Sequence, residues 1–175
     1  PEDERVGKMV IVGMAAKYVP GFTMASTPIF EKVVPDETLA KAIICDLDGT
    51  LALSGGRRGP YEHQKCDQDD VNPPILRLLG YYNFMEYAIL YMSGREDRFR
   101  PQTEAFLMKW HCPRGPLWMR ATGDFRKDWI VKGELFDAHV REKYNVEFVL
   151  DDRDQVVKMW RGLGLTCFQV QEGKF

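Results

Sequence analysis

Short runs of apolar residues alternate along this chain with longer stretches in which apolar residues recur at helical spacing. The short runs predict buried strands at 42–45, 87–92, 117–119, 148–150 and 166–170. The longer stretches predict helices that begin at 72–73 and others at 101–111, 127–144 and 153–161. Strands that alternate with helices in this way favour right-handed crossovers and a parallel sheet. We therefore expect an α/β fold of three layers, with helices on both faces of the sheet.

The first forty residues have a different pattern. A short helical pattern at 10–18 ends in a Pro-Gly pair, and a stretch rich in Ser, Thr and Pro follows at 23–28. These features are typical of a linker. We place a boundary at 39–41, so that 1–40 form an N-terminal extension and 41–175 form one globular domain.

Composition excludes several classes of protein. Of the 175 residues, 45% are hydrophobic and 29% are charged, which is the balance of a globular protein. The net charge of −2 excludes a protein that binds nucleic acid through an overall basic field, but not one that holds a nucleic-acid end with a few arginines. The apolar runs are far shorter than the ~20 residues that cross a bilayer, so we expect no membrane association.

The cysteine pattern predicts reduced thiols. The chain has four cysteines and no Cys-x-x-Cys pair; they are Cys45, Cys66, Cys112 and Cys167. Such spacing is not typical of a disulfide framework or a zinc site, so we expect a cytoplasmic protein.

Polar and charged residues follow three of the predicted strands. They are Asp46-Leu47-Asp48-Gly49-Thr50 after the first, Ser93-Gly94-Arg95 after the second and Asp151-Asp152 after the fourth. Ligands of parallel sheets bind beyond the carboxyl ends of the strands. We therefore expect these three segments to meet in one crevice.

The first segment has the pattern of a catalytic pair. Asp46 and Asp48 suit a nucleophile and a proton donor if the chain turns sharply, which Gly49 permits. The alternative is an acidic turn that merely ends a strand. An EF-hand is excluded, because Leu51 stands where that loop needs glycine and Arg57 stands at its twelfth position.

The acidic pair Asp151 and Asp152 predicts a cation site. Adjacent carboxylates repel each other unless a cation lies between them and Asp46, and oxygen ligands favour Mg²⁺. The alternative is an acidic N-terminus for the helix at 153–161, where negative charge complements the helix dipole. The two interpretations are compatible.

The second segment and one helical lysine suit a phosphate group. Ser93, Gly94 and Arg95 offer a hydroxyl, a free backbone N–H and a guanidinium. The alternative is a plain turn between a strand and a helix. Lys132 lies on the helix predicted at 127–144; a lone helical lysine is usually a solvated charge, but here it would balance the carboxylates and the phosphate.

These motifs resemble the haloacid dehalogenase superfamily of aspartyl-phosphate enzymes. The chain has Asp-x-Asp-Gly-Thr after the first strand, Ser after the second, a helical Lys and Asp-Asp after the fourth, in the order of that family across 41–152. The resemblance implies a Rossmann-like, HAD-like parallel sheet. The segment 53–70 is too short for a large cap domain, so we expect a minimal cap.

A narrower resemblance, from Lys41 to the C-terminus, is to the 3′-phosphatase domain of phage T4-type polynucleotide kinase/phosphatase. The matching segments are 56–61, 65–67, 93–96, 123–128 and 151–161. The resemblance implies that Asp46 is the nucleophile and Asp48 the general acid and base. It implies removal of a terminal 3′-phosphate from DNA or RNA through an aspartyl-phosphate, in nucleic-acid repair.

The same resemblance implies a ligand set. It assigns Mg²⁺ to Asp46, the backbone carbonyl of Asp48 and Asp152, with Asp151 acting through water. It assigns the scissile phosphate to Ser93 and Lys132, with Gly94 beside them. The further functional positions that it implies are Arg58, Arg95, Arg120 and Asp128.

One departure concerns the arginine loop, which has the pair Arg57-Arg58 where the family has a single arginine. Arg58 directly precedes Gly-Pro-Tyr, so we assign the role to Arg58 and keep Arg57 as the alternative.

The N-terminal extension is similar to the tail of a kinase domain, and the family's phosphatase follows such a domain. We therefore expect a chain cut from a longer bifunctional protein of a phage-infected bacterial cell. No Gly-x-x-x-x-Gly-Lys-Ser/Thr loop is present, so we expect no kinase activity from this chain. The alternative functions are a phosphatase of a small metabolite and a non-catalytic module that binds nucleic-acid ends.

Overall fold

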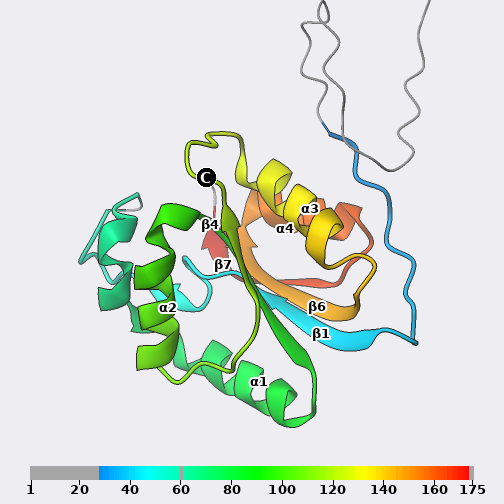
Figure 1. Ribbon diagram of the computed structural model, residues 1–175, viewed down its shortest axis with the longest axis horizontal. Coiled ribbons are helices and arrows are strands. Elements are labelled where there is room, and N and C mark those ends of the chain that lie inside the picture. The colour runs from blue at the N-terminus through cyan, green and yellow to red at the C-terminus, as the bar shows by residue number, and fades with distance from the viewer. Residues whose placement is uncertain (1–27, 60, 174–175) are drawn as a thin grey trace, which may run out of the picture.

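The computed structural model describes residues 28–59 and 61–173 and contains a central five-stranded sheet (Figure 1). Its strand order is β5-β4-β1-β6-β7, and every neighbouring pair is parallel. The strands are β1 (Ala40–Cys45), β4 (Ala88–Glu96), β5 (Leu117–Arg120), β6 (Tyr144–Arg153) and β7 (Cys167–Gly173). The parallel sheet predicted from the apolar runs is confirmed, with the first predicted strand at its centre.

Helices cover both faces of the sheet. They are α1 (Pro73–Phe84), α2 (Arg100–Lys109), α3 (Asp128–His139) and α4 (Asp154–Gly162). Alternate residues of β1 point to opposite faces: Ala42 and Ile44 belong to the core under α3 and α4, and Ile43 and Cys45 to the core above α1 and α2. Each fully buried large apolar side chain contributes about 1.5–3 kcal/mol to folding. Helices on both faces of the parallel sheet confirm the predicted three-layer α/β fold (Figure 1).

The segment between the first strand and α1 forms a small substructure. Strands β2 (Ala52–Leu53) and β3 (Asp70–Val71) pair antiparallel, and the 3-10 helix η1 (His63–Gln68) lies between them along the chain and packs against α2. A second 3-10 helix, η2 (Asp97–Phe99), leads into α2. The patterns of the sequence did not predict these elements, but their small size agrees with the expected minimal cap.

Several predicted boundaries are wrong. Strands β4 and β6 continue through the segments 93–95 and 151–152, which we expected to lie just beyond the strands. The pairing register shifts at both places, so the backbone stays extended although its regular ladder is interrupted. Helix α3 ends at His139 rather than at 144, because Tyr144 already pairs with Ala40 in the sheet.

Residues 28–39 contain no helix or strand, and part of this segment packs on the helical layer. The ring of Phe30 meets the ring of Trp129 edge to face, with centroids 6.3 Å apart. The Val33 N–H donates a hydrogen bond of 2.8 Å to the Leu163 carbonyl. The short helix predicted at 10–18 lies outside the described residues. In the described part of the chain, no helix combines the length and the apolar character that crossing a bilayer requires.

Candidate active site

The central strand delivers the first acidic motif to the carboxyl end of the sheet. The Asp46 N–H donates to the Leu150 carbonyl at 3.0 Å, which holds Asp46 beside β6. The chain then turns at Gly49, whose φ is +81° and whose absent Cβ would collide with the Asp152 carboxylate. A side chain at this position would therefore be strained and would displace an acidic group of the site.

Three buried carboxylates meet where β1 and β6 end. Asp46, Asp151 and Asp152 each offer an oxygen, and these oxygens all lie within 4.8 Å of one another. Lys132 on α3 donates to Asp46 Oδ1 at 2.6 Å and to Asp151 Oδ2 at 2.7 Å. The segments after the first and fourth predicted strands thus meet, and the helical lysine is a buried partner of both rather than a solvated charge.

The carboxylates of this cluster outnumber the cations. Burial raises the pKa of Asp46 well above its usual range; Lys132 opposes the shift, and Asp151 and Asp152 add to it. Burial and the charge of Asp151 raise the pKa of Asp152 to about 6. Further positive charge among three hard oxygen donors would relieve both shifts, so the donor set fits Mg²⁺.

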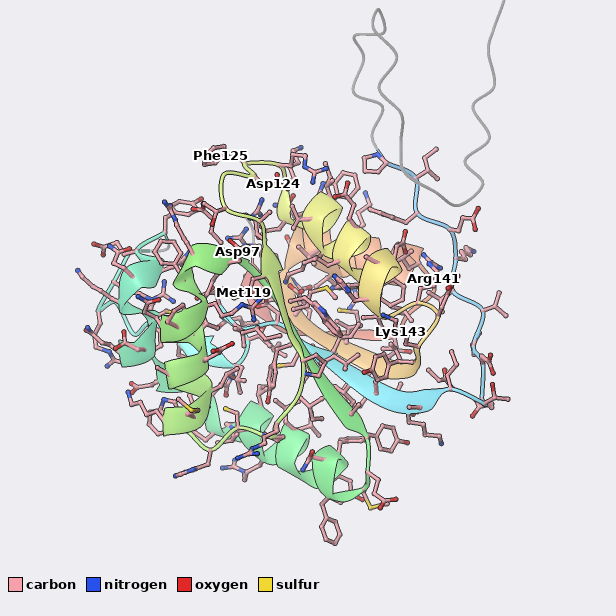
Figure 2. The ribbon with its side chains drawn as sticks, viewed as in Figure 1. Asp97, Met119, Asp124, Phe125, Arg141 and Lys143 are labelled. Atoms are coloured by element: carbon pink, nitrogen blue, oxygen red, sulfur yellow. The ribbon has the colours of Figure 1, made fainter. Side chains whose placement is uncertain are left out.

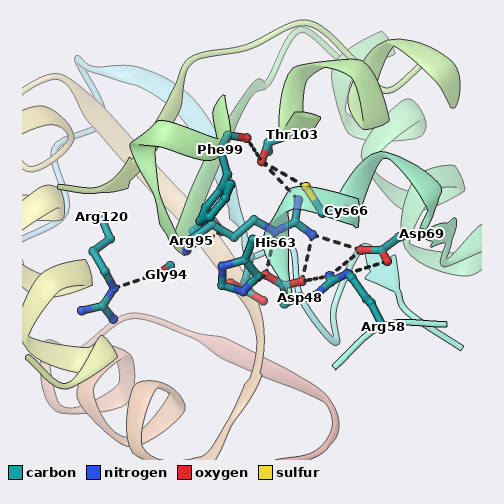
Figure 3. A network of polar contacts seen from close by, with 12 residues as sticks. Asp48, Arg58, His63, Cys66, Asp69, Gly94, Arg95, Phe99, Thr103 and Arg120 are labelled. Carbon is teal, nitrogen blue, oxygen red and sulfur yellow. Dashed lines mark hydrogen bonds and ion pairs between the residues drawn. The ribbon is translucent and has the colours of Figure 1, made fainter. Parts of the chain in front are cut away.

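Asp48, two residues after Asp46, has a different environment (Figure 3). Arg95 donates to both of its carboxylate oxygens, with Nε 2.7 Å from Oδ2 and Nη2 2.8 Å from Oδ1. Arg58 Nη2 lies 2.5 Å from Asp48 Oδ1 and 2.5 Å from Asp69 Oδ2, and its Nε donates to Asp69 Oδ1 at 2.8 Å. Arg95 also reaches Asp69 Oδ2 at 3.3 Å. Two arginines and two aspartates therefore form one network.

This network keeps Asp48 ionised. Burial alone would raise its pKa, but the charges and hydrogen bonds of Arg95 and Arg58 hold the pKa well below the usual range of a carboxyl group. Arg95 is fully buried and Arg58 nearly so. Both guanidinium groups bind Asp48 in this structure, so their predicted contact with the substrate phosphate stays a prediction.

The two candidates in the arginine loop lie in different places. Arg58 contacts Asp48, whereas Arg57 Nη2 pairs with Asp70 Oδ2 at 2.5 Å on the surface, where the two side chains are 46% and 57% exposed. The geometry therefore favours Arg58 over Arg57.

A second ion-pair network surrounds Asp128. Asp128, at the start of α3, accepts from both Arg120 and Arg153. Arg120 also donates from Nε to the Gly94 carbonyl at 2.8 Å. A Cβ at Gly94 would lie 2.7 Å from Asp128 Oδ1, so glycine leaves room for this carboxylate. Ser93 is fully buried, and its Oγ accepts from the Arg95 N–H at 3.2 Å.

A cavity of about 460 Å³ collects most of these residues. Its lining includes seven of the predicted site residues, namely Asp46, Asp48, Gly94, Arg120, Asp128, Lys132 and Asp152. The other four predicted site residues do not line this cavity. Three of them are buried, namely Ser93, Arg95 and Asp151. Arg58 lines a neighbouring cavity of about 410 Å³, whose lining also includes Asp48 and Asp152.

Sequence reasoning missed several residues of this region. Asp69 binds both buried arginines, and its signal was indirect, since buried guanidinium groups require carboxylate partners. Tyr61, His63 and Phe125 also line the 460 Å³ cavity. Tyr61 and Phe125 lie in segments that carry the family resemblance, but the sequence assigned no role to any of the three.

Comparison with a known family model covers most of the chain. Residues 40–175 match the model of the polynucleotide kinase PNKP phosphatase domain. A protein of Autographa californica nuclear polyhedrosis virus, named as a bifunctional polynucleotide kinase/RNA ligase, is 35% identical over 145 residues. That alignment covers 81% of this chain and 21% of the viral protein.

Solved structures agree with the family match. Chains from two structures of a Pnkp1/Rnl/Hen1 complex, one titled as an RNA repair complex, are 45% and 46% identical with TM-scores of 0.79 and 0.80. The matches cover 90% and 89% of this chain and 50% and 52% of those chains. A class C acid phosphatase from Bacillus anthracis with bound tungstate is 18% identical, with a TM-score of 0.52. The match covers 65% of this chain and 52% of the acid phosphatase chain, and at this identity it supports the fold alone. The chain thus spans about a fifth to a half of the length of these relatives.

Proposed function

The chain belongs to the PNKP phosphatase family of HAD-like phosphatases, and from that premise we propose that it removes a terminal 3′-phosphate from a DNA or RNA strand. One observation carries the proposal: a single cavity presents Asp46 beside an acidic cation site and Asp48 beside two arginines. A nucleophile and a proton carrier two residues apart are the minimum that an aspartyl-phosphate reaction requires.

Asp46 performs the first bond exchange. A carboxylate oxygen of Asp46 attacks the phosphorus, the bond from phosphorus to the 3′ oxygen breaks, and the phosphoryl group is transferred to Asp46. Lys132 orients this carboxylate through its 2.6 Å hydrogen bond to Oδ1. Its ammonium also offsets negative charge on the transferring phosphoryl group.

Asp48 moves the protons. It donates a proton to the leaving 3′ oxygen, and it then takes a proton from the water that attacks the aspartyl-phosphate, which releases phosphate and restores Asp46. In the free protein the two arginines hold Asp48 ionised, which is the form that a base requires. The negative charge of a bound phosphate ester raises the pKa of Asp48 and favours the uptake of the proton that it must donate.

The acidic cluster is the proposed metal site. Asp46, the Asp48 carbonyl and Asp152 would hold Mg²⁺, and Asp151 would support it through water. When bound, the ion supplies positive charge that offsets the carboxylates and the phosphoryl oxygens. The raised pKa values of Asp46 and Asp152 support this assignment, because burial and the neighbouring carboxylates disfavour the charged forms, and a bound cation would offset that charge.

The form of the site supports a polymer end as the substrate. The insertion between β2 and β3 contains one short 3-10 helix, too little to enclose a small metabolite completely. The viral relative is named as a bifunctional polynucleotide kinase/RNA ligase, and two of the matched chains come from Pnkp1/Rnl/Hen1 complexes. We propose that this domain acts in the cytoplasm on ends formed during nucleic-acid repair, beside a kinase domain of a longer protein.

Phosphate release from matched substrates tests this function. The purified chain is given 3′-phosphorylated DNA and RNA oligonucleotides, sugar phosphates as small-molecule controls, and EDTA followed by excess Mg²⁺. We expect release from the oligonucleotides, loss in EDTA and recovery in Mg²⁺. A preference for sugar phosphates would indicate a metabolite phosphatase, and binding of the oligonucleotide without turnover would indicate a non-catalytic module.

A further inference from the structure

Two exposed aromatic side chains lie at the mouth of the catalytic cavity. Phe125 is 90% exposed and belongs to the loop between β5 and α3; Figure 2 shows it at the outer edge of the molecule, next to Asp124. Tyr61 is 79% exposed and precedes η1. Both side chains line the same cavity as Asp46. The exposed rings are therefore part of the surface that a substrate of this cavity meets.

The segment before Phe125 is held by the end of β4 and by η2. Glu96 Oε2 accepts from the Gly123 N–H at 2.9 Å. Asp97 Oδ1 accepts from the N–H and the hydroxyl of Thr122 at 3.0 and 2.6 Å. These contacts fix the backbone on the N-terminal side of the ring.

The segment around and after Phe125 is held by two arginines. Arg120 Nη1 donates to the carbonyls of Asp124 and Arg126 at 2.9 and 2.7 Å. The Arg126 side chain pairs in turn with Asp124 and with Glu134 on α3. The loop is therefore braced on both sides of the residue whose ring it leaves in solvent. These contacts hold the backbone of the loop, so the ring of Phe125 is kept at the cavity without being packed into the core.

Two cationic side chains, Arg98 and Lys127, line the same cavity as these rings, and Arg98 Nη2 also pairs with Glu96 Oε1 at 2.6 Å. The Arg98 guanidinium lies over the Phe99 ring at 4.8 Å. Lys127 is exposed. Aromatic faces that alternate with cations are typical of surfaces that bind single-stranded nucleic acid, since bases stack on the rings and phosphates meet the charges.

We propose that Phe125, together with Tyr61, stacks on a nucleobase at the 3′ end of the strand whose terminal phosphate lies at Asp46. The inference rests on the proposed 3′-phosphatase function and adds the part of the substrate that the protein recognises beyond the phosphate. DNA and RNA share this chemistry, so the stacking residues recognise an unpaired end of either polymer. Phe125 is a positioning residue: it holds the strand and touches no reacting atom.

The test combines two changes, one in the protein and one in the substrate. The protein variants are Phe125→Ala, Phe125→Trp and the control Phe84→Ala, which removes a ring that is 82% exposed on α1 and lines neither this cavity nor its neighbour. The substrates are 3′-phosphorylated DNA and RNA oligonucleotides with all bases present, or with an abasic residue at the terminal or the penultimate position. Steady-state KM and kcat are measured for every combination.

We expect Phe125→Ala to raise KM for the intact strand about 5- to 150-fold, the range that loss of one base–aromatic stack gives, with a smaller change in kcat. Phe125→Trp retains most of the affinity, and Phe84→Ala matches the wild type. One of the two abasic substrates should raise KM for the wild-type protein. The same substrate should raise KM for Phe125→Ala little further, because removal of the ring and removal of the base abolish the same contact.

Failure of the stacking inference and failure of the proposed function give different results. If the wild-type protein releases phosphate from the intact strand but Phe125→Ala has the same KM as Phe84→Ala, the stacking proposal is wrong and the proposed function stands. If the effect of Phe125→Ala is equally large on abasic strands at both positions, the ring does not contact a base and the proposal is also wrong. If the wild-type protein releases no phosphate from any oligonucleotide, the proposed function fails and the stacking inference fails with it.

Discussion

Asp46 and Asp48 are chemically identical and lie two residues apart, yet the fold gives them opposite surroundings. Asp46 lies beside the carboxylates of Asp151 and Asp152, and Lys132 is the cation that it contacts there. Asp48 is bound by two arginines. Burial with excess negative charge raises the pKa of Asp46, and excess positive charge lowers the pKa of Asp48.

The difference indicates how one turn can supply two catalytic functions. Environments that push the pKa values of two neighbouring groups apart identify the groups that take different roles in a reaction. The acidic side attracts a cation and holds the nucleophile. The guanidinium side orients the group that carries protons and holds it ionised in the free protein. The predictions below alter one side at a time.

The largest effect is expected on the acidic side. Asp46→Asn removes the oxygen that forms the acyl-phosphate, so turnover should fall by about 10⁴- to 10⁶-fold on every substrate, the scale on which removal of a nucleophile is felt. Steady-state phosphate release from an oligonucleotide and from nitrophenyl phosphate measures it. Wild-type melting behaviour of the variant would show that the loss is chemical. Retained turnover would place the nucleophile elsewhere.

Removal of a guanidinium from the other side should have the next largest effect. Arg58→Ala or Arg95→Ala leaves Asp48 and Asp69 with one arginine, so kcat/KM should fall by about one to two powers of ten, the equivalent of a charge-assisted contact. Loss of a buried pair also costs about 3–5 kcal/mol of stability. Lys at position 95 should not restore activity, because it cannot bind both oxygens of Asp48.

The neighbouring arginine provides the matched control for that experiment. The pair between Arg57 and Asp70 is exposed, so Arg57→Ala should cost at most about 1 kcal/mol of stability and leave kcat/KM nearly unchanged. Denaturant unfolding and oligonucleotide kinetics on the three alanine variants separate these outcomes. A large kinetic loss in Arg57→Ala with none in Arg58→Ala would reverse the assignment within the arginine loop.

A further prediction on the acidic side is a pH dependence of stability. Asp152 has a pKa of about 6 in the folded protein against an ordinary value of 3.8. The folded protein therefore holds more protons than the unfolded chain between these values, and the free energy of unfolding should fall as pH rises through that window. Mg²⁺ should restore stability above pH 6 and do little near pH 4, because it binds the ionised carboxylates.

Urea unfolding at several pH values, in EDTA and in Mg²⁺, measures this slope. Subtraction of the same series for Asp152→Asn isolates the contribution of this carboxylate from other titrating groups. A flat difference between the two proteins across the window, or equal stabilisation by Mg²⁺ at pH 4 and pH 7, would contradict the cation-site assignment.

The acidic side of the cavity could be predicted from the sequence and the guanidinium side only in part. Apolar runs place Asp46 and Asp151 at the carboxyl ends of two strands, and the rules of parallel sheets bring those ends together. The partnership of Arg58 with Asp69 depends on how the segment 54–69 folds back against α2. No periodic pattern encodes that packing.

The predicted ends of helices and strands are wrong where pairing between distant residues outweighs the local sequence pattern. The helical spacing of apolar residues continues to Val140, but α3 stops at His139, and after a turn the chain pairs Tyr144 with Ala40, which is distant in sequence. Phe125 was missed for a different reason. It lies in the matching segment 123–128, but an exposed ring on a loop has no chemical role by itself, and its proposed role comes from the cavity beside it.

The central claim is that Asp46 forms the covalent intermediate and Asp48 moves the protons. Rapid mixing of nitrophenyl phosphate with Asp46→Asn and with Asp48→Asn tests it most directly, because nitrophenolate leaves without a proton. We expect no burst from Asp46→Asn. Asp48→Asn should release one equivalent of nitrophenolate and then stall as the aspartyl-phosphate, since no base activates the water. A burst from Asp46→Asn, or steady wild-type turnover from Asp48→Asn, would contradict the account.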